Sequence, residues 1–390
     1  MRFENSRQAS GRMESTKRTR LACIGDHEFY VVTRFVGPVR VSFELEAVPA
    51  TTRSDVPPVA TGELVVIDST ASGKGRTAQD DFYQIVIGPV FEKLNLHHTL
   101  IKTTSRDSIS SYARTLDTGR SYTVMLLSGD TSISELINNL PQRFCGSELS
   151  VLPFPLGSGN AWASSLGFLD PAETLHSFLT GSLSSKHFPL YRAVFPNGYS
   201  IVFFIILSLG FHANMLHACE APEYKRMGNE RFREAGGRVL AQYDLDLGIT
   251  AGGLTNSYSY FALINTPNLE PAYTPSPQSN PLRHELHVLA YSSSLGKDQL
   301  LASIMKGYRL KKGEELPKEA GTTYLPMTTD FDVKLNIDPE KAPRYKFEIC
   351  CDGVLLNLLD LQSEDTVKNT IHIEFPHHYS GFNLKVLSPR

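Results

Sequence analysis

Short apolar runs alternate with helical stretches over residues 62–195 of this chain. Each run leads into a loop of small residues, which is typical of a buried strand. Alternation of strands and helices favours a mainly parallel sheet with helices on both faces. The helices that this pattern predicts are 78–94, 108–115, 132–140, 161–166 and 171–180.

Strands dominate the second half of the chain, from residue 196 to residue 390. The most apolar run, 201–209, is too short to cross a bilayer and reads as a buried strand. One helical insert is expected at 222–236, and the Pro- and Ser-rich stretch 266–281 reads as a long surface loop. We therefore expect an α/β domain at 62–195 and a β-rich domain at 196–390. The expected strands of the second domain are 201–209, 257–264, 285–291, 331–337, 345–351, 370–375 and 382–387.

The N-terminal region precedes both domains and has a different character. Residues 1–19 are basic and polar without the apolar core of a signal peptide, so we expect a disordered tail. Residues 20–61 begin with strand-like stretches and end in a segment rich in Pro, Thr and Ser. This pattern predicts a small β appendage followed by a linker.

Composition narrows the class of protein without identifying a function. A chain of 390 residues suits two domains, and its 41% hydrophobic and 20% charged residues are typical of globular proteins. The formal charge of −3 does not indicate the basic surface with which proteins bind nucleic acid. Its 5 cysteines are odd in number and lack C-x-x-C spacing, which favours reduced thiols in the cytoplasm and no metal site.

Three of the predicted strands end in loops that suit an anion. The loops are 68–75, 128–132 and 155–160, and each opens a helix. Loops of this composition bring backbone N–H groups close to a ligand, and the helix N-terminus behind them favours negative charge. At the carboxyl ends of neighbouring parallel strands they would form a polyphosphate cradle. The sequence therefore predicts a nucleotide site.

The residue types in these loops, and the order of the loops along the chain, resemble those of a known family. Ser72-Gly73-Lys74-Gly75, Ser128-Gly129-Asp130 and Pro155 to Asn160 are followed by Gly210-Phe211-His212-Ala213-Asn214, and late in the chain by Asp352-Gly353. In this order they resemble the diacylglycerol kinase catalytic-domain family of lipid kinases, closest to the sphingosine and ceramide kinase branch. Motifs in a fixed order are more specific than any single Gly-rich loop.

The resemblance implies a fold, cofactors and partners. The fold would be an NAD kinase/diacylglycerol kinase-like α/β domain followed by a β-rich, sandwich-like domain that binds lipid, with a cleft between them. ATP and Mg²⁺ would be the cofactors. The substrate would be a membrane lipid with a primary hydroxyl: a sphingoid base, a ceramide or a diacylglycerol. The protein would be cytoplasmic with peripheral membrane association, and the oligomeric state stays open, a homodimer included.

Asp130 is the candidate catalytic residue. It lies in a tight loop directly after a buried strand, where an acidic side chain has no packing role. The resemblance implies that it acts on the acceptor hydroxyl or in the Mg²⁺–ATP network. The structural alternative is an Asx-turn or a helix cap, although Ser132 with Glu135 forms a capping box and is the better cap.

The resemblance also implies which residues bind the nucleotide. Several of them could equally have a purely structural role. Asn160 can cap the helix that begins at Ala161, Thr104 can belong to a surface turn, and Lys225 can lie on a solvated helix face. The nucleotide-binding candidates are Asp68, Ser72, Gly73, Lys74, Thr104, Ser128, Gly129, Thr131, Gly157, Ser158, Gly159, Asn160, Lys225, Arg231 and Asp352.

Two residues are candidates for contact with the lipid substrate. Asn214 matches a position where sphingosine kinases have an Asp that pairs with the ammonium group of the lipid, and an amide offers no such ion pair. His212 is the second candidate for a substrate contact. Its alternative is a histidine with its hydrogen bonds satisfied in the core or at the surface.

Three departures from the family pattern leave a second reading open. Asp68 and Ser69 replace Asn-Pro, Thr131 replaces a Gly expected at positive φ, and Val354 replaces a Glu. The alternative is therefore a catalytically degenerate lipid- or nucleotide-binding relative with a regulatory role. An enzyme of the NAD kinase type shares the second loop, but the match at 210–232 argues against it.

Overall fold

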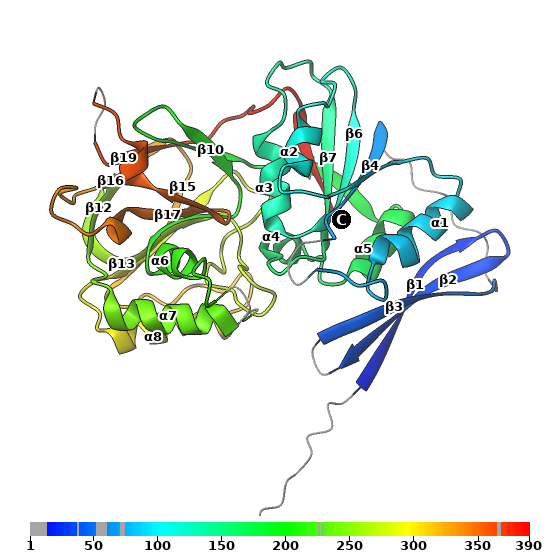
Figure 1. The fold of residues 1–390 in the computed structure, drawn as a ribbon, viewed down its shortest axis with the longest axis horizontal. Coiled ribbons are helices and arrows are strands. Elements are labelled where there is room, and N and C mark those ends of the chain that lie inside the picture. Colours follow the sequence, from blue (N-terminus) through cyan, green and yellow to red (C-terminus); the bar gives the residue numbers. More distant parts are fainter. Residues whose placement is uncertain are drawn as a thin grey trace, which may run out of the picture.

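The computed structural model describes residues 14–36, 39–51, 61–70, 75–224, 227, 230–364 and 368–390. Figure 1 shows two large bodies side by side and a small sheet that projects from one of them. The described strands form sheets of three, six and eleven strands. Among the described residues, no helix is long and apolar enough to span a bilayer.

The six-stranded sheet forms the core of the first domain. Its order is β5-β4-β6-β7-β20-β8, and every pair is parallel except β20 with β8. Every residue of β6 is buried, because helices cover both faces of the sheet. The strands are β4 (Glu63–Asp68), β5 (Thr99–Lys102), β6 (Tyr122–Ser128), β7 (Glu148–Pro155), β8 (Leu183–His187) and β20 (Asn383–Pro389). The helices are η1 (Tyr83–Ile87), α1 (Gly88–Lys93), α2 (Ser108–Ala113), α3 (Asp130–Asn138), α4 (Ala161–Ser165) and α5 (Pro171–Leu179).

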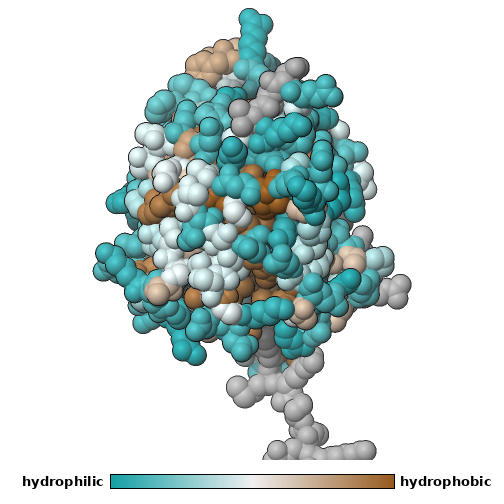
Figure 2. All heavy atoms as spheres, turned by 90° about the vertical axis from the view of Figure 1, so that its left-hand side faces the viewer, coloured by the Kyte–Doolittle hydropathy of each residue, from teal (hydrophilic) through white to brown (hydrophobic). Residues whose placement is uncertain are grey.

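The second domain is a large, curled antiparallel sheet with helices at one edge. Its strands run in the order β10-β9-β19-β16-β12-β13-β11-β17-β18, and β14 and β15 join at β13. Figure 2 shows the face turned away from the first domain, where apolar side chains appear between hydrophilic ones. The strands are β9 (Tyr191–Val194), β10 (Ser200–Phe203), β11 (Ile206–Gly210), β12 (Leu247–Ala251), β13 (Leu254–Ile264), β14 (Leu286–Ser292), β15 (Thr322–Met327), β16 (Phe331–Leu335), β17 (Glu348–Cys351), β18 (Val354–Asn357) and β19 (Thr370–Glu374). The helices are α6 (Phe211–Ala218), α7 (Glu230–Gln242), α8 (Lys297–Met305), η2 (Lys306–Tyr308), η3 (Arg344–Phe347) and η4 (Leu358–Leu361).

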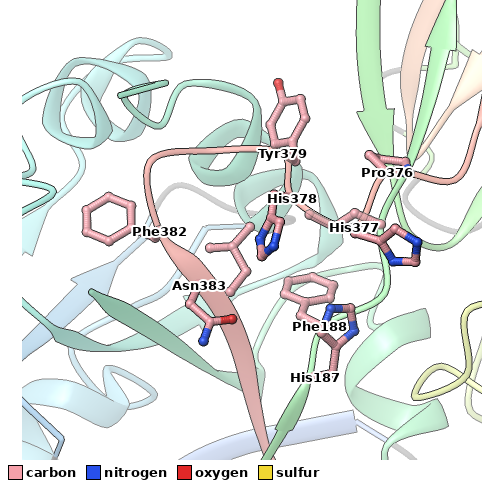
Figure 3. A pocket seen from close by; sticks show the side chains of 10 residues that line it. His187, Phe188, Pro376, His377, His378, Tyr379, Phe382 and Asn383 are labelled. Atoms are coloured by element: carbon pink, nitrogen blue, oxygen red, sulfur yellow. The ribbon is translucent and has the colours of Figure 1, made fainter. Parts of the chain in front are cut away.

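A single domain boundary at residue 196 is wrong for this topology. β9 already belongs to the second sheet, and β20 returns from the second domain to pair with β7 and β8 of the first. The chain therefore crosses between the domains twice, at 188–190 and at 375–382. Figure 3 shows the two crossings beside each other around a small cavity, with His187 and Phe188 from one and Pro376 to Asn383 from the other.

Several element boundaries also differ from the sequence pattern. The expected run 201–209 is two strands, β10 and β11, and the helix expected at 78–94 begins only at Tyr83. The expected helical insert is α7, which begins at Glu230, and a further helix, α6, precedes it. Strand 345–351 begins as the 3₁₀-turn η3.

The N-terminal sheet is an antiparallel meander of β1 (Glu14–Ile24), β2 (His27–Val36) and β3 (Val39–Pro49). Residues 14–19, which the sequence assigned to a disordered tail, lie in β1; residues 1–13 are outside the described residues. Lys17 Nζ donates to Asp170 at 3.0 Å and to Glu173 at 2.7 Å on α5. The rings of Phe43 and Phe82 lie 4.8 Å apart, so this sheet shares the core of the first domain.

The side chain of Asn138 connects the two large domains by hydrogen bonds. The Oδ1 atom of Asn138, at the end of α3, accepts the backbone N–H of Val202 at 2.8 Å, and its Nδ2 atom donates to the carbonyl of Val202 at 2.9 Å. Because β10 ends the path of the second sheet, this pair satisfies backbone groups that an edge strand leaves open. The α3 helix therefore presents its first turn at a fixed position beside the second domain.

Candidate active site

The second and third loops interlock through two glycines. A Cβ atom added at Gly157 would lie 2.2 Å from the Cα of Gly129, and one added at Gly129 would lie 2.6 Å from the carbonyl oxygen of Gly159. The backbone N–H of Asp130 donates to that same carbonyl at 3.2 Å. The contact of the two loop backbones is therefore sufficient to explain glycine at both positions.

Asp130 joins the two loops through its side chain. Its Oδ2 atom accepts the backbone N–H of Ala161 at 2.7 Å, and its Oδ1 atom accepts that of Trp162 at 3.1 Å. These N–H groups begin α4, so Asp130 caps the following helix from a different segment of the chain. The indole ring of Trp162 in turn stacks on Phe188 at 4.3 Å, in one of the crossings between the domains.

The capping predictions made from the sequence are wrong. Asn160 occupies the N-cap position of α4, but its side chain bonds both the N–H and the carbonyl of Gly157, at 3.0 and 2.9 Å. Ser132 lies inside α3, which begins at Asp130 with Gly129 as its N-cap. Glu135 accepts the N–H of Ser110 at 3.0 Å, beside α2. Asn160 thus bonds within its own loop, whereas the partner of Glu135 is brought close by the fold.

Burial changes the acidity of Asp130. Loss of solvent raises the pKa of this carboxyl group to about 6, against the opposing effect of the two N–H donors from Ala161 and Trp162. Asp130 is therefore mostly ionised at neutral pH, yet it accepts a proton more readily than an ordinary aspartate. A pKa near the working pH suits a general base.

Asp352 and Gly353 form the turn between β17 and β18. Their φ angles are +46° and +87°, as a two-residue hairpin turn requires. The Asp352 carboxylate accepts the N–H groups of Phe204, Ile205 and Ile206 at 2.7, 3.0 and 2.8 Å. Burial raises the pKa of Asp352 to about 7, and the nearby charge of Asp130 adds to this increase. Asp352 was a candidate for nucleotide binding, and the side-chain contacts that the structure shows are to the segment joining β10 to β11.

The hairpin turn of the second domain lies against the first turn of α3. A Cβ atom added at Gly353 would lie 3.4 Å from the Oγ1 atom of Thr131. Thr131 is helical and exposed, and it is absent from the non-glycine residues with positive φ, which are Asn95, Asp352 and Asn369 among the described residues. The loop therefore takes a conformation in which this position does not need glycine. The α3 N-terminus has no side-chain cap and carries an exposed hydroxyl.

The first loop is held by an arginine that the sequence analysis missed. Arg76 Nη1 lies 2.6 Å from Asp68 Oδ1, and both side chains are buried. The Nη2 atom of Arg76 also donates to the carbonyls of Ser69 and Leu127. Burial raises the pKa of Asp68, and Arg76 opposes this shift. Arg76 therefore joins the end of β4, at Asp68, to the end of β6, at Leu127. The only sequence signal for Arg76 is its place directly after the Gly75 turn.

The other nucleotide-binding candidates are dispersed. Ser128 is buried at the end of β6, and Ser158 is exposed in the third loop. Thr104 is exposed, and its N–H donates to Ser108 Oγ at 3.0 Å. Arg231 lies on α7 with its guanidinium 4.8 Å from the centre of the Phe232 ring, and its Nε atom is buried without a hydrogen-bond partner. Ser72, Gly73, Lys74 and Lys225 lie outside the described residues.

The two lipid candidates lie on α6. The Nδ2 atom of Asn214 donates to Glu348 Oε2 and to the carbonyl of Tyr345, both at 2.7 Å, and the side chain is buried. Burial raises the pKa of Glu348, which the sequence analysis missed because it lies far away in the chain. His212 Nδ1 lies 2.7 Å from Ser208 Oγ, and burial lowers its pKa to about 4, so this ring is neutral. Among the described residues, no group of three His, Cys, Asp or Glu side chains is arranged to hold a metal ion.

The sequence of this chain is similar to those of known lipid kinases. Residues 63–187 match the family model of the diacylglycerol kinase catalytic domain. Human sphingosine kinase 1 is 27% identical over 180 residues, which cover 43% of this chain and 46% of that protein. The chain thus aligns with less than half the length of this curated relative.

The fold class predicted from the sequence is confirmed by solved structures. The crystal structure of a diacylglycerol kinase from Bacillus anthracis str. Sterne superimposes with a TM-score of 0.54 at 15% identity, covering 84% of this chain and 96% of that one. At this identity the likeness shows a shared fold. In sequence, residues 63–187 of this chain are similar to the diacylglycerol kinase catalytic-domain family.

Proposed function

We propose that this protein is an ATP-dependent lipid kinase that transfers the γ-phosphate to the primary hydroxyl of a sphingoid base, a ceramide or a diacylglycerol. The observation that carries the proposal is the position of Asp130. Its loop interlocks with the third loop through Gly129 and Gly157, and the first turn of α3 lies against Gly353 of the second domain. An acidic residue that the first domain fixes in this way, beside the second domain, is suited to acting on a hydroxyl group.

The residues present fit a magnesium nucleotide. The α3 N-terminus lacks a side-chain cap, Thr131 and Ser158 are exposed, and the partial positive charge of a helix N-terminus favours an anion. Thr131 and Ser158 would contact the phosphates, which would carry the Mg²⁺. When bound, Mg²⁺–ATP supplies the phosphoryl group and the cation that offsets its charge.

In this proposal Asp130 orients the acceptor hydroxyl and takes its proton. Two N–H donors fix the carboxylate, and each carboxylate oxygen keeps a further lone pair that can accept a hydrogen bond. The raised pKa lets the group hold a proton after transfer. The neutral ring of His212 and the Asn214–Glu348 pair would form the polar part of the lipid site on α6.

A catalytically inactive relative is the second candidate, and two observations favour it. Both oxygens of Asp130 already serve a structural purpose as the cap of α4. The charge of Asp68, one of the departures from the family pattern, is neutralised by Arg76. In this case the loops would bind nucleotide or lipid without transfer.

Transfer of radiolabelled phosphate separates the two candidates. The purified protein would be incubated with labelled ATP, Mg²⁺ and a panel of sphingoid base, ceramide and diacylglycerol in mixed micelles. Wild type should label at least one lipid, Asp130→Asn should label it at least about 10²-fold more slowly, and Asp107→Asn, an exposed acid of the same domain, should match wild type. Absence of transfer by wild type to every lipid would favour the inactive relative.

A further inference from the structure

The cavity between the two domain crossings is rich in histidine. His187 lines it from the end of β8, and His377 and His378 line it from the second crossing. Figure 3 shows these three rings around the cavity together with the side chain of Asn383, from the start of β20. We refer to the space that these residues line as the crossing cavity. Among the described residues that line it, none is an Asp or a Glu, so no carboxylate offsets the bases from within the cavity.

Two further bases lie beside the crossing cavity. Lys385 is directly opposite His187 in the pairing of β20 with β8, so the two side chains share one face of the sheet. The ring of His284, before β14, lies 6.4 Å from that of His187 and 5.9 Å from that of His377. Four histidines and one lysine from separate segments of the chain therefore meet where the domains join.

These bases have few partners. In the part of the chain that the structure describes, the side chains of all of them except His284 make no hydrogen bond or ion pair. The Nε2 atom of His284 donates to the carbonyl of Leu190 at 3.1 Å. Partial burial lowers the pKa of His187, and the positive charges of His284 and Lys385 lower it further. His187 therefore resists protonation as long as its neighbours are the only charges nearby.

The acids around the cavity already have partners. Burial lowers the pKa of His284, and Asp330 opposes this shift, but the carboxylate of Asp330 also accepts the backbone N–H of Phe375 at 2.7 Å. Glu374 pairs with Arg192. Other charged residues on the surrounding segments are Glu148, which accepts the hydroxyl of Ser150, Glu285, which lies 3.7 Å from His287, and the cations Arg143 and Lys186. The bases at the cavity therefore outnumber the acids that could offset them.

A cavity of this kind is complementary to a small anion. Because the bases face it from several segments, an anion with acceptor oxygens in several directions fits better than a planar carboxylate, and hydrogen bonds from charged donors to such oxygens are strong. We propose that the crossing cavity binds a phosphate group, either as the free ion or as a phosphomonoester whose organic part lies in solvent. Protonated His187 and His377 would donate to its oxygens, and Lys385 would add a further positive charge.

The crossing cavity is separate from the candidate active site. β20 begins beside it and runs parallel to β7, whereas the three loops follow the carboxyl ends of their strands, at the opposite edge of the sheet. Phe188, which also lines the cavity, stacks on Trp162 at 4.3 Å, and Asp130 accepts the N–H of Trp162. A bound phosphate would therefore connect both crossings beside an aromatic pair that leads to Asp130.

Sulfate is the probe for this site, because it has the tetrahedral shape of phosphate and keeps both charges near neutral pH. Calorimetric titration of the full chain should show binding at least about fivefold tighter at about pH 6 than at about pH 8, since the anion favours protonated histidine. His187→Gln/His377→Gln should weaken sulfate binding about tenfold or more at the lower pH and remove most of the pH dependence. The matched control His27→Gln/His97→Gln, which changes exposed histidines elsewhere in the molecule, should bind like wild type.

A lysine variant tests the part of the site that does not titrate. Lys385→Met should weaken sulfate binding at both pH values, because the ammonium group is charged at each, whereas Lys334→Met, at an exposed position of β16, should leave it unchanged. Inorganic phosphate and glycerol phosphate, titrated in turn, separate the two forms of the ligand. Tighter binding of glycerol phosphate would identify a phosphomonoester as the occupant, and tighter binding of inorganic phosphate would identify the free ion.

Several results would overturn the proposal. These are equal sulfate affinity in His187→Gln/His377→Gln and wild type, sulfate affinity that does not change with pH, and binding of acetate or chloride as tight as that of sulfate at the same ionic strength. Melting curves without added anion would verify that each variant is folded. Since neither nucleotide nor lipid is present in these titrations, their outcome does not depend on the proposed kinase activity.

Discussion

The carboxylate of Asp130 accepts the backbone N–H of Ala161 at 2.7 Å, and through this bond the second loop holds the helix that follows the third. The residue assigned to catalysis therefore also has a structural task. A negative charge at the N-terminus of a helix is stabilising, while burial of the charge is unfavourable. The balance leaves an aspartate that is fixed in direction and more basic than usual.

Substitution of Asp130 by Asn should affect turnover and stability together. We expect kcat to fall by about 10²-fold or more, because the amide cannot accept a proton. We expect the free energy of unfolding to fall by about 1 kcal/mol, since an amide offers one acceptor oxygen for the two N–H groups at the start of α4. Kinase assays and urea unfolding would measure the two effects. Wild-type turnover in a folded variant would remove Asp130 from the mechanism.

The activity should have an acidic limb set by Asp130. Since the pKa of this carboxyl group is about 6 and the proposed base is its ionised form, kcat/KM should fall as pH is lowered through about 6. The same raised pKa means that ionisation of Asp130 is less favourable in the folded state. Its contribution to stability should decline as pH rises from the ordinary value of 3.8 to about 6 and then stay constant. A pH–rate profile without an inflection near 6 would contradict this assignment.

Replacement of Gly157 by Ala should disrupt the paired loops. The added methyl group would lie 2.2 Å from the Cα of Gly129, so backbone must move, at an expected cost of about 1–3 kcal/mol. Transfer should fall in parallel, because the movement displaces the loop of Asp130. Gly237→Ala, on the exposed side of α7 with no atom near the new methyl group, should leave stability unchanged or raise it by about 1 kcal/mol. Similar melting curves for Gly157→Ala and wild type would show that the loops can separate freely.

Loss of Arg76 should destabilise the first domain. Arg76→Ala leaves the buried carboxylate of Asp68 without its partner, and breaking a buried ion pair in this way costs about 3–5 kcal/mol. The double variant Arg76→Met/Asp68→Leu removes both charges and should recover most of this loss. Chemical unfolding of wild type, the single variant and the double variant would measure it. Equal stability of the single and double variants would show that the charge of Asp68 is not the cause.

The sequence alone determined the fold class, the strands that carry the three loops, and the place of Asp130 directly after β6. These features depend on periodicity and on loop composition, which the backbone geometry of strands and helices imposes locally. The apolar runs around Val66, Val124 and Val151 are all buried strands of one parallel sheet. Local chemistry was enough to place these strands and the loops that follow them.

Only the tertiary structure decided which groups meet. Val386 belongs to a strand that the pattern predicts for the second domain, yet it pairs with Val151 in the sheet of the first domain. Asp130 caps α4 in place of Asn160 because the fold brings the second loop against the start of that helix, and Arg76 meets Asp68 because the first loop folds back on the end of β4. Hydrogen bonds and ion pairs act over a few ångströms in space and are indifferent to separation along the chain. Sequence spacing therefore could not choose among these partners.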